Sequence, residues 1–235
     1  MRGTAIIGEA PAMIELHRVS KVYSVGPVKV PALSDVSFRI AKGEYVTLSG
    51  PSGAGKTTLL RLLYRDDVPS EGQVEVLERD VAGLSRSQAA ALRRSIGLVF
   101  QDAKLLPGRT VYENVAFVLR VLGTPRREIT GRVFDALRAV GLSARSQASP
   151  AQLSQGEAQR AALARAIARK PLLLIADEPT GNLDEGMAAE VLEIVRDIWA
   201  GGTTVLFATH QATLAASLKQ RTLTIQHGRL VKDEG

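Results

Sequence analysis

The stretch GPSGAGKT at residues 50–57 constrains the fold more than any other part of the chain. It follows the apolar run YVTLS and leads into KTTLLRLLY, so we expect a strand, a glycine-rich turn and a helix in that order. This arrangement is typical of a phosphate-binding loop. Gly53 and Gly55 allow successive N–H groups to point inward, and the helix N-terminus adds positive potential. A glycine-rich turn that binds nothing is the alternative, and this context disfavours it.

Two side chains of this loop carry the expected nucleotide chemistry. Lys56 would supply a point charge for the β- and γ-phosphates, and Thr57 would offer a hydroxyl ligand to Mg²⁺. The sequence therefore predicts a site for ATP and Mg²⁺.

A pair of carboxylates follows a second apolar run, LLLIA at residues 172–176. An uninterrupted apolar run is typical of a strand buried on both faces. Ligands of open α/β sheets bind at the C-terminal ends of the strands, where Asp177 and Glu178 would lie. We expect Asp177 to hold the Mg²⁺ and Glu178 to act as the base or to orient the attacking water. Without the phosphate loop, a solvated acidic strand end would be the better interpretation.

Two further polar residues follow predicted strands. His210 ends TTVLFATH and is placed to donate a hydrogen bond to the γ-phosphate, although a lone histidine is more often structural. Gln101 follows IGLVF and is placed to reach the Mg²⁺ or the attacking water, an ordinary loop residue being the alternative.

The patterns along the chain indicate one α/β domain over residues 13–232. Short alternating runs at residues 13–48 predict strands. Residues 103–150 are mostly helical, with breaks at Pro107-Gly108, at 123–125 and at Gly141. From residue 171 onward, apolar strands alternate with helices, which indicates a parallel sheet covered by helices. A helical subdomain of about residues 102–160 is therefore inserted in the sheet-containing core.

Composition narrows the range of functions. The 235 residues include no cysteine and three histidines, which disfavours disulfides, thiolate metal sites and histidine-rich metal clusters. The apolar runs are too short to cross a membrane, and the N-terminus lacks a secretory signal, so we expect a cytoplasmic protein. The net charge of +6 is compatible with nucleic acid, an anionic membrane face or a polyphosphate ligand, or simply with an arginine-rich composition.

The stretch LSQGEAQRAALARA at residues 153–166 predicts a helix that begins with a capping box. Ser154 would be the N-cap, and Glu157 lies three residues on. The capping box leaves Gly156 unexplained, because glycine costs about 1 kcal/mol against alanine inside a helix. A close approach of another group to the backbone is one explanation.

Taken in order, these motifs resemble the ATP-binding subunits of ABC transporters over roughly residues 13–232. The resemblance implies a P-loop NTPase with a RecA-like parallel sheet core, an N-terminal antiparallel β subdomain and an inserted helical subdomain. It implies that the chain hydrolyses ATP and that Tyr23 stacks on adenine. It also matches residues 181–184 to the D-loop. Further implied nucleotide contacts come from Gly50, Ser52, Ala54, Thr58 and Asp184.

The resemblance also suggests why residue 156 is glycine. In this family two copies pair head to tail on ATP binding, and the signature segment of one faces the phosphate loop of the other. Ser154 Oγ and the Gly156 N–H would then bind the γ-phosphate held by the partner copy. Gln155 departs from the second glycine of the usual LSGGQ pattern, but both contacts remain available.

Residues 59–76 and 93–123 resemble the cell-division branch of the family, whose ATPase works with an FtsX-like membrane protein. The stretch DEPTGNLD is shared with lipoprotein-release and macrolide-export ATPases, so an exporter permease is the alternative partner. Either partner would hold the chain at the inner face of the plasma membrane. Apolar positions at Leu105, Leu106, Val111 and Val115 would form a groove for the partner or belong to the subdomain core.

A role on nucleic acid is the alternative from another class. DNA-repair members of the family carry a long coiled-coil insertion between the phosphate loop and the signature segment. The interval from Lys56 to Ser154 is too short for that insertion and lacks sustained heptads. No nucleic-acid partner is therefore expected.

Overall fold

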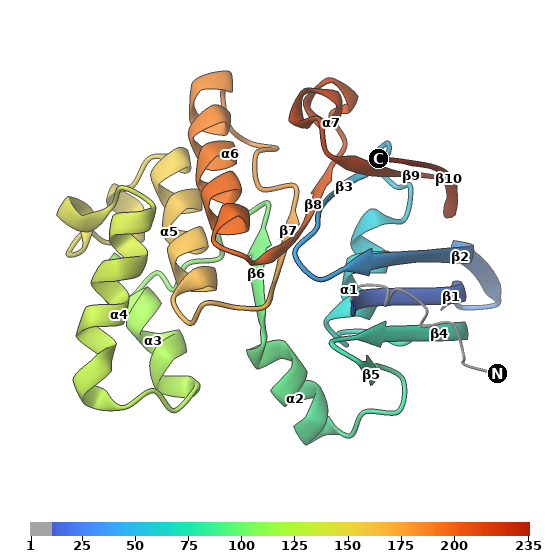
Figure 1. The fold of residues 1–235 in the computed structure, drawn as a ribbon, viewed down its shortest axis with the longest axis horizontal. Helices are drawn as coiled ribbons and strands as arrows, with labels where there is room; N and C mark the ends of the chain where they lie inside the picture. Colours follow the sequence, from blue (N-terminus) through green and yellow to red (C-terminus); the bar gives the residue numbers. More distant parts are fainter. Residues whose placement is uncertain (1–10) are drawn as a thin grey trace, which may run out of the picture.

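The computed structural model describes residues 11–235 and shows an α/β fold built on two sheets (Figure 1). We expect no secretory signal at the N-terminus. Residues 1–10 of that segment lie outside the described residues. Within the described residues, no helix has the length and hydropathy to cross a bilayer.

The larger sheet has six strands in the order β10-β9-β3-β8-β7-β6. β3 pairs in parallel with β8 and β9, β7 pairs in parallel with β6 and β8, and only β10 runs antiparallel to its neighbour. β3 and β8 are buried at every position, as expected for strands covered on both faces. The strands are β3 Tyr45–Ser49, β6 Ile96–Phe100, β7 Leu173–Asp177, β8 Thr204–Thr209, β9 Arg221–Gln226 and β10 Arg229–Glu234.

The smaller sheet is antiparallel and has the order β2-β1-β4-β5. Its strands are β1 Ala12–Val25, β2 Val28–Ala41, β4 Glu71–Val76 and β5 Arg79–Asp80. Helix α1, Lys56–Leu63, lies between the two sheets, and its leucines pack with residues of both in one hydrophobic core. The predicted antiparallel β subdomain is confirmed, and it brings β2 against the phosphate loop.

A second hydrophobic core covers the opposite face of the larger sheet. The helices that contribute to it lie at the left in Figure 1. The predicted breaks at Pro107-Gly108, residues 123–125 and Gly141 all fall between helices or at their ends. The helices of this layer are α3 Val111–Val121, α4 Arg126–Ala139, α5 Gln155–Ile167 and α6 Glu185–Ala200. The remaining helices are α2 Arg86–Arg94 and α7 Ala212–Leu218, with 3₁₀ turns at Ser143–Arg145 and Pro150–Gln152.

Of the two alternatives predicted for the apolar positions near α3, a docking groove or the subdomain core, the core holds for Val111 and Val115. Val111 and Val115 are fully buried in the core that α3 shares with α4 and α5, so they offer no surface to a partner. Leu105 and Leu106, in the loop before α3, are only half-buried.

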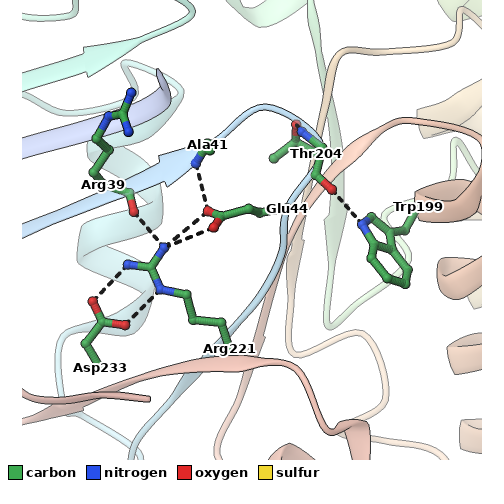
Figure 2. A network of polar contacts seen from close by, with 8 residues as sticks. Arg39, Ala41, Glu44, Trp199, Thr204, Arg221 and Asp233 are labelled. Carbon is green, nitrogen blue, oxygen red and sulfur yellow. Dashed lines mark hydrogen bonds and ion pairs between the residues drawn. The ribbon is translucent and has the colours of Figure 1, made fainter. Parts of the chain in front are cut away.

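The turn between β2 and β3 is held to the rest of the molecule by a polar network (Figure 2). Arg221 of β9 forms two 2.8 Å hydrogen bonds to Asp233 of β10. Its remaining nitrogen donates to the carbonyl of Arg39 at 2.9 Å and to Glu44 at 3.1 Å. Trp199 of α6 donates to the carbonyl of Gly43 at 2.7 Å. One arginine thus links both sheets, because Arg39 belongs to β2 and Arg221 to β9.

Candidate functional site

The phosphate loop follows β3 and has a backbone that only glycine fits at two places. Gly50 has φ +152°, and a side chain there would collide with the carbonyl of Ile225. Gly55 has φ +109°, and an added Cβ would lie 2.6 Å from the carbonyl oxygen of Ala32. The loop is therefore packed between β9 and β2, which fixes the direction in which α1 begins.

A cleft of about 350 Å³ opens in front of this loop. It forms where the loop after β3 meets the C-terminal ends of β6 and β7, as expected for ligand sites of open α/β sheets. Its lining consists of Ala32, Ser52, Gly53, Gly55, Lys56, Thr57, Thr58, Gln101, Asp177 and Glu178. Gly50 and Ala54 belong to the same loop, and the Ala54 side chain is buried in the core beneath it.

Lys56 is folded onto its own loop. Its Nζ donates to the carbonyls of Gly50 at 2.7 Å and Pro51 at 3.1 Å, and it lies 3.3 Å from Oε1 of Glu178. The side chain is only 4% exposed, so its charge is balanced within the protein and not by water. A phosphate entering the cleft would meet an ammonium group held beside the loop, which would turn from these carbonyls to the phosphate oxygens.

Glu178 joins Lys56 to His210. Its second oxygen, Oε2, accepts a 2.7 Å hydrogen bond from Nδ1 of His210, which follows β8. The backbone of Glu178 has φ +52°, a left-handed conformation that costs free energy in residues other than glycine, and its N–H donates to the carbonyl of Ala208 at 3.0 Å. Strain of this kind is concentrated at functional sites.

Asp177 faces the first helical turn of α1. Its Oδ1 lies 3.5 Å from Oγ1 of Thr57, at the limit of a hydrogen bond. Burial raises the pKa of Asp177, the hydroxyl of Thr57 acts in the opposite direction, and the neighbouring charge of Glu178 raises it further. The charges of Lys56 and Lys104 act to lower it, but burial prevails and the pKa of Asp177 remains raised.

The oxygen donors around Asp177 fit a magnesium ion. The carboxylate of Asp177, the hydroxyl of Thr57 and the amide oxygen of Gln101 are the hard ligands that Mg²⁺ prefers. No cluster of three histidine, cysteine or acidic residues occurs among residues 11–235. The three oxygen donors from Asp177, Thr57 and Gln101 suit an ion that keeps some of its waters and also binds substrate phosphates, which is how Mg²⁺ usually binds.

Gln101 is tied to the segment after Glu178. Its Nε2 donates to Oδ1 of Asn182 at 3.1 Å, and a side chain at Gly181 would come within 3.1 Å of the same nitrogen. The predicted D-loop therefore contacts Gln101 within one chain. We expect a movement of either segment to reach the other.

Three residues that the sequence analysis missed hold the region around Gln101. Gln159 donates to the carbonyl of Phe100 at 2.9 Å. Arg165 donates to the carbonyls of Ala103 and Lys104 at 2.8 and 2.7 Å. Asn114, fully buried, accepts from the N–H of Leu106 at 2.7 Å and donates to nearby carbonyls. A buried polar residue in an apolar helix is the signal that would have found Asn114, because buried amides need partners.

The signature segment does not contribute to this cleft. Ser154 is the N-cap of α5, and its hydroxyl accepts from the N–H of Glu157 at 3.1 Å, so the predicted capping box is present. A Cβ at Gly156 would lie 2.7 Å from Sδ and 3.2 Å from Cβ of Met187 in α6. Packing within the chain thus supplies a reason for glycine that the sequence did not reveal.

Two other predicted nucleotide contacts lie outside the cleft lining. Asp184 is the N-cap of α6 and accepts from the N–H of Met187 at 2.8 Å. Tyr23 lies on β1, half-buried, and its hydroxyl donates to Oδ2 of Asp67 at 2.9 Å. The structure therefore brings together the residues of the phosphate loop with Gln101, Asp177, Glu178 and His210, while Tyr23, Ser154, Gly156 and Asp184 lie apart from them.

Comparison with known proteins gives one consistent result. A family model described as ABC transporter matches residues 33–181. The cell division ATP-binding protein FtsE of Streptococcus pneumoniae is 44% identical, with 95% of this chain and 96% of that protein covered. The FtsE proteins of Bacillus subtilis and Escherichia coli are 44% and 43% identical, with 94% and 93% of this chain and 96% and 97% of their own length covered.

Solved structures agree in fold. A dimeric ATP-binding cassette in a post-hydrolysis state bound to ADP and phosphate has a TM-score of 0.87 and 32% identity, covering 94% of this chain and 98% of that one. The cbiO1 component of a Clostridium perfringens ABC transporter complex also has a TM-score of 0.87, with 28% identity over 95% of this chain and 88% of that one.

Proposed function

We propose that this chain acts in cell division as the ATP-binding subunit of a membrane complex. The chain belongs to the ABC transporter family and is an ATPase of the ABC type. The observation that carries the proposal is the convergence of Lys56, Thr57, Asp177, Glu178 and Gln101 on one cleft at the C-terminal ends of parallel strands. The cell-division role rests on the FtsE relatives, which match nearly the whole chain.

The phosphate loop binds the β- and γ-phosphates of ATP. The loop residues Gly50, Ser52, Gly53, Ala54 and Gly55 direct backbone N–H groups at the phosphates, and Thr58 continues the N-terminus of α1. Lys56 turns from the loop carbonyls to the phosphate oxygens, which offer a stronger ionic partner than a carbonyl. Tyr23 stacks on the adenine base.

Thr57, Asp177 and Gln101 hold Mg²⁺ together with ATP. When bound, the ion neutralises charge on the phosphate oxygens. Burial and the charge of Glu178 raise the pKa of Asp177 by more than the Thr57 hydroxyl, Lys56 and Lys104 lower it. That environment favours the binding of a cation beside the carboxylate.

Glu178 acts as the general base or orients the attacking water, and His210 assists. With Nδ1 of His210 donating to Glu178, its Nε2 donates to the γ-phosphate only when the ring carries a proton on both nitrogens, and we assign that form to the ATP-bound site. Glu178 is also 3.3 Å from Lys56. Phosphate binding by Lys56 would draw this cation away from Glu178.

Two copies of the chain close on two ATP molecules. The dimeric cassette of similar fold supports this proposal. Ser154 and Gly156 of one copy contact the γ-phosphate held by the other, and Asp184 lies at the same junction. These residues lie outside the cleft of their own chain, as expected for groups that act on a partner copy.

The membrane partner docks beside α3. A groove of about 440 Å³ lies between α2, β6, α3 and α5, with Arg93, Arg94, Val118 and Val121 in its lining. Val121 is 58% exposed. This groove replaces the predicted one at Val111 and Val115, and an FtsX-like protein is the proposed occupant. The chain would then be peripheral at the cytoplasmic face of the membrane.

The test is affinity purification of tagged Glu178→Gln protein from its native membrane with Mg·ATP present. We expect an FtsX-like membrane protein to be recovered. An exporter permease in its place would leave the ATPase chemistry intact and overturn the role in cell division. A Val121→Glu variant, which places a charge in the proposed groove, is expected to lose the partner while binding ATP normally.

A further inference from the structure

A three-residue cluster joins β1 to the segment between α1 and β4. Nζ of Lys21 lies 2.6 Å from Oδ1 of Asp67 and donates to the carbonyl of Val68 at 2.8 Å. The hydroxyl of Tyr23 donates to the other oxygen of Asp67 at 2.9 Å. The Lys21 and Asp67 side chains are 11% and 18% exposed, so this ion pair is largely shielded from water.

The cluster fixes the ring of Tyr23 at two points. Asp67 holds the hydroxyl end of the ring, and Nζ of Lys21 lies over the ring at 5.0 Å from its centroid. A cation at this distance is attracted to an aromatic face. Lys21 therefore lies over one face of the ring, and the Tyr23 side chain is only half-buried.

Asp67 is itself held in place. Its Oδ1 also accepts from the N–H of Val68 at 2.7 Å. Burial acts to raise the pKa of Asp67, but the hydrogen bonds from Lys21, the Val68 N–H and Tyr23 outweigh it, and the pKa is lowered. Asp67 is thus a fixed, charged acceptor for the tyrosine hydroxyl.

The ring lies on the strand pair that borders the phosphate cleft. Tyr23 is the register partner of Val30 on β2. Two residues further along β2, Ala32 lines the cleft, and its carbonyl packs against the Gly55 backbone. A nucleotide with its phosphates in this loop has its base within reach of the β1–β2 pair.

We propose that Asp67 and Lys21 are positioning residues for nucleotide binding, which hold the Tyr23 ring so that its open face receives the adenine base. This inference rests on the proposed function, in which Tyr23 stacks on adenine. An aromatic ring held in its bound orientation loses less conformational entropy when the ligand binds. The benefit applies to the base alone, since neither residue lines the phosphate cleft.

The experiment compares a ligand that has a base with one that lacks it. Binding of Mg·ATP and of magnesium tripolyphosphate is measured for the full chain, for Asp67→Asn and for Tyr23→Phe, which removes only the hydroxyl. Each variant is expected to raise the Kd for ATP about three- to tenfold, a part of what loss of an aromatic stack costs. The Kd for tripolyphosphate should not change. In hydrolysis assays the KM for ATP should rise while kcat is retained.

Two controls make the result specific. Asp66→Asn removes the adjacent carboxylate, which pairs with the more exposed Arg61, and should leave ATP binding unchanged. The double variant Tyr23→Phe/Asp67→Asn should be no worse than Asp67→Asn alone, because the two changes act on the same hydrogen bond. Tyr23→Phe keeps the test valid if Asp67→Asn fails to fold.

Three results would overturn the inference. Normal ATP affinity in both single variants would show that the cluster does not position the ring. Equal losses for ATP and tripolyphosphate would show a general structural effect. Normal ATP affinity in Tyr23→Ala would show that adenine does not stack on Tyr23. Failure of the proposed nucleotide site is distinguishable, because the unaltered chain would then bind neither ligand.

Discussion

Glu178 contacts both Lys56 and His210, and ATP binding would separate it from Lys56. One carboxylate oxygen lies 3.3 Å from the ammonium of Lys56, and the other accepts a 2.7 Å hydrogen bond from His210. Phosphate binding by Lys56 would draw the ammonium away from Glu178, so occupancy of the loop and the position of the proposed base are coupled through one ion pair.

The first prediction concerns this base. Glu178→Gln keeps the size of the side chain but cannot take a proton, so ATP hydrolysis should fall by about 10²–10⁴. ATP affinity should be retained, because the phosphates are held by the loop and Lys56. Single-turnover hydrolysis and equilibrium ATP binding measure the two quantities separately. Hydrolysis at the rate of the unaltered chain would show that Glu178 is not the base.

The second prediction concerns the charge of Asp177. Its raised pKa means that the folded, nucleotide-free protein binds this proton more tightly than the unfolded chain does. The ionised form therefore costs stability above the raised pKa, and that cost disappears as the pH falls below the usual carboxyl value. Asp177→Asn should raise the Tm of the nucleotide-free protein at neutral pH, and the gain should vanish in acid.

The matching measurement uses the ligand. Mg·ATP should raise the Tm of the unaltered chain more than that of Asp177→Asn, because the variant has lost a ligand of the ion. An unchanged Tm at neutral pH without nucleotide would contradict the electrostatic account of Asp177.

The sequence predicted where several strands and helices end, but it did not predict the contacts between residues that are distant in the chain. Asp177 and His210 were predictable because each directly follows or ends an apolar run, and Lys56 because it belongs to the glycine-rich motif at residues 50–57. The Lys56–Glu178 contact joins residues that are far apart in the chain, and the orientation of two flexible side chains has no pattern in the sequence. The same holds for Gln159 and Arg165, whose partners are backbone carbonyls with no sequence signal of their own.

At the scale of elements, the contact between α5 and α6 changes the explanation of one glycine. The sequence predicted the capping box of α5 correctly, because Ser154 and Glu157 are local neighbours. It could not reveal Met187, which reaches Gly156 from another helix. Helix α2 also went unassigned, because it is short, strongly polar and buries only Ala89 and Leu92. A short helix with two apolar anchors gives a weak periodic signal.

The third prediction separates packing from nucleotide contact at Gly156. Gly156→Ala should cost about 1–3 kcal/mol of unfolding free energy, because the added methyl overpacks the contact with Met187. Gly156→Ala/Met187→Ala should recover most of that stability, which chemical denaturation measures. We expect ATPase activity to stay low in the double variant, since the methyl group still stands at the proposed contact with the partner's γ-phosphate. Full recovery of activity would assign the glycine to packing alone.

At the scale of the whole molecule, Arg221 links both sheets and the C-terminal hairpin. The fourth prediction is that Arg221→Met lowers the unfolding free energy by about 1–2 kcal/mol, since charged hydrogen bonds to Asp233 and to the Arg39 carbonyl are lost. The size of the effect is limited because Asp233 is 39% exposed and solvent screens the pair. Lys232→Met is the matched control. It removes the exposed ion pair between Lys232 and Glu234 on β10, the strand that carries Asp233, and should have little effect on the unfolding free energy.

Acid should erase part of this difference. Arg221 lowers the pKa of Asp233 through hydrogen bonding, although burial partly opposes it. The pair therefore stabilises the fold above the usual carboxyl pKa, and the contribution is lost as the pH falls through the lowered value. The gap between Arg221→Met and the unaltered chain should narrow over that range, and a constant gap would contradict the role of the ion pair.

The fifth prediction concerns assembly of two copies. In a Glu178→Gln background, which should retain ATP, the chain is expected to sediment as a dimer with Mg·ATP and as a monomer without it. Adding Ser154→Ala should weaken the dimer at least tenfold, because one hydroxyl is removed from each of two composite sites.

The same change removes an N-cap, which costs about 1 kcal/mol on its own. Ser85→Ala supplies the control, because Ser85 caps α2 through an equivalent capping box far from the proposed junction. If both serine variants weaken the dimer equally, the effect comes from helix stability; if only Ser154→Ala does so, the signature segment of one copy completes the site of the other.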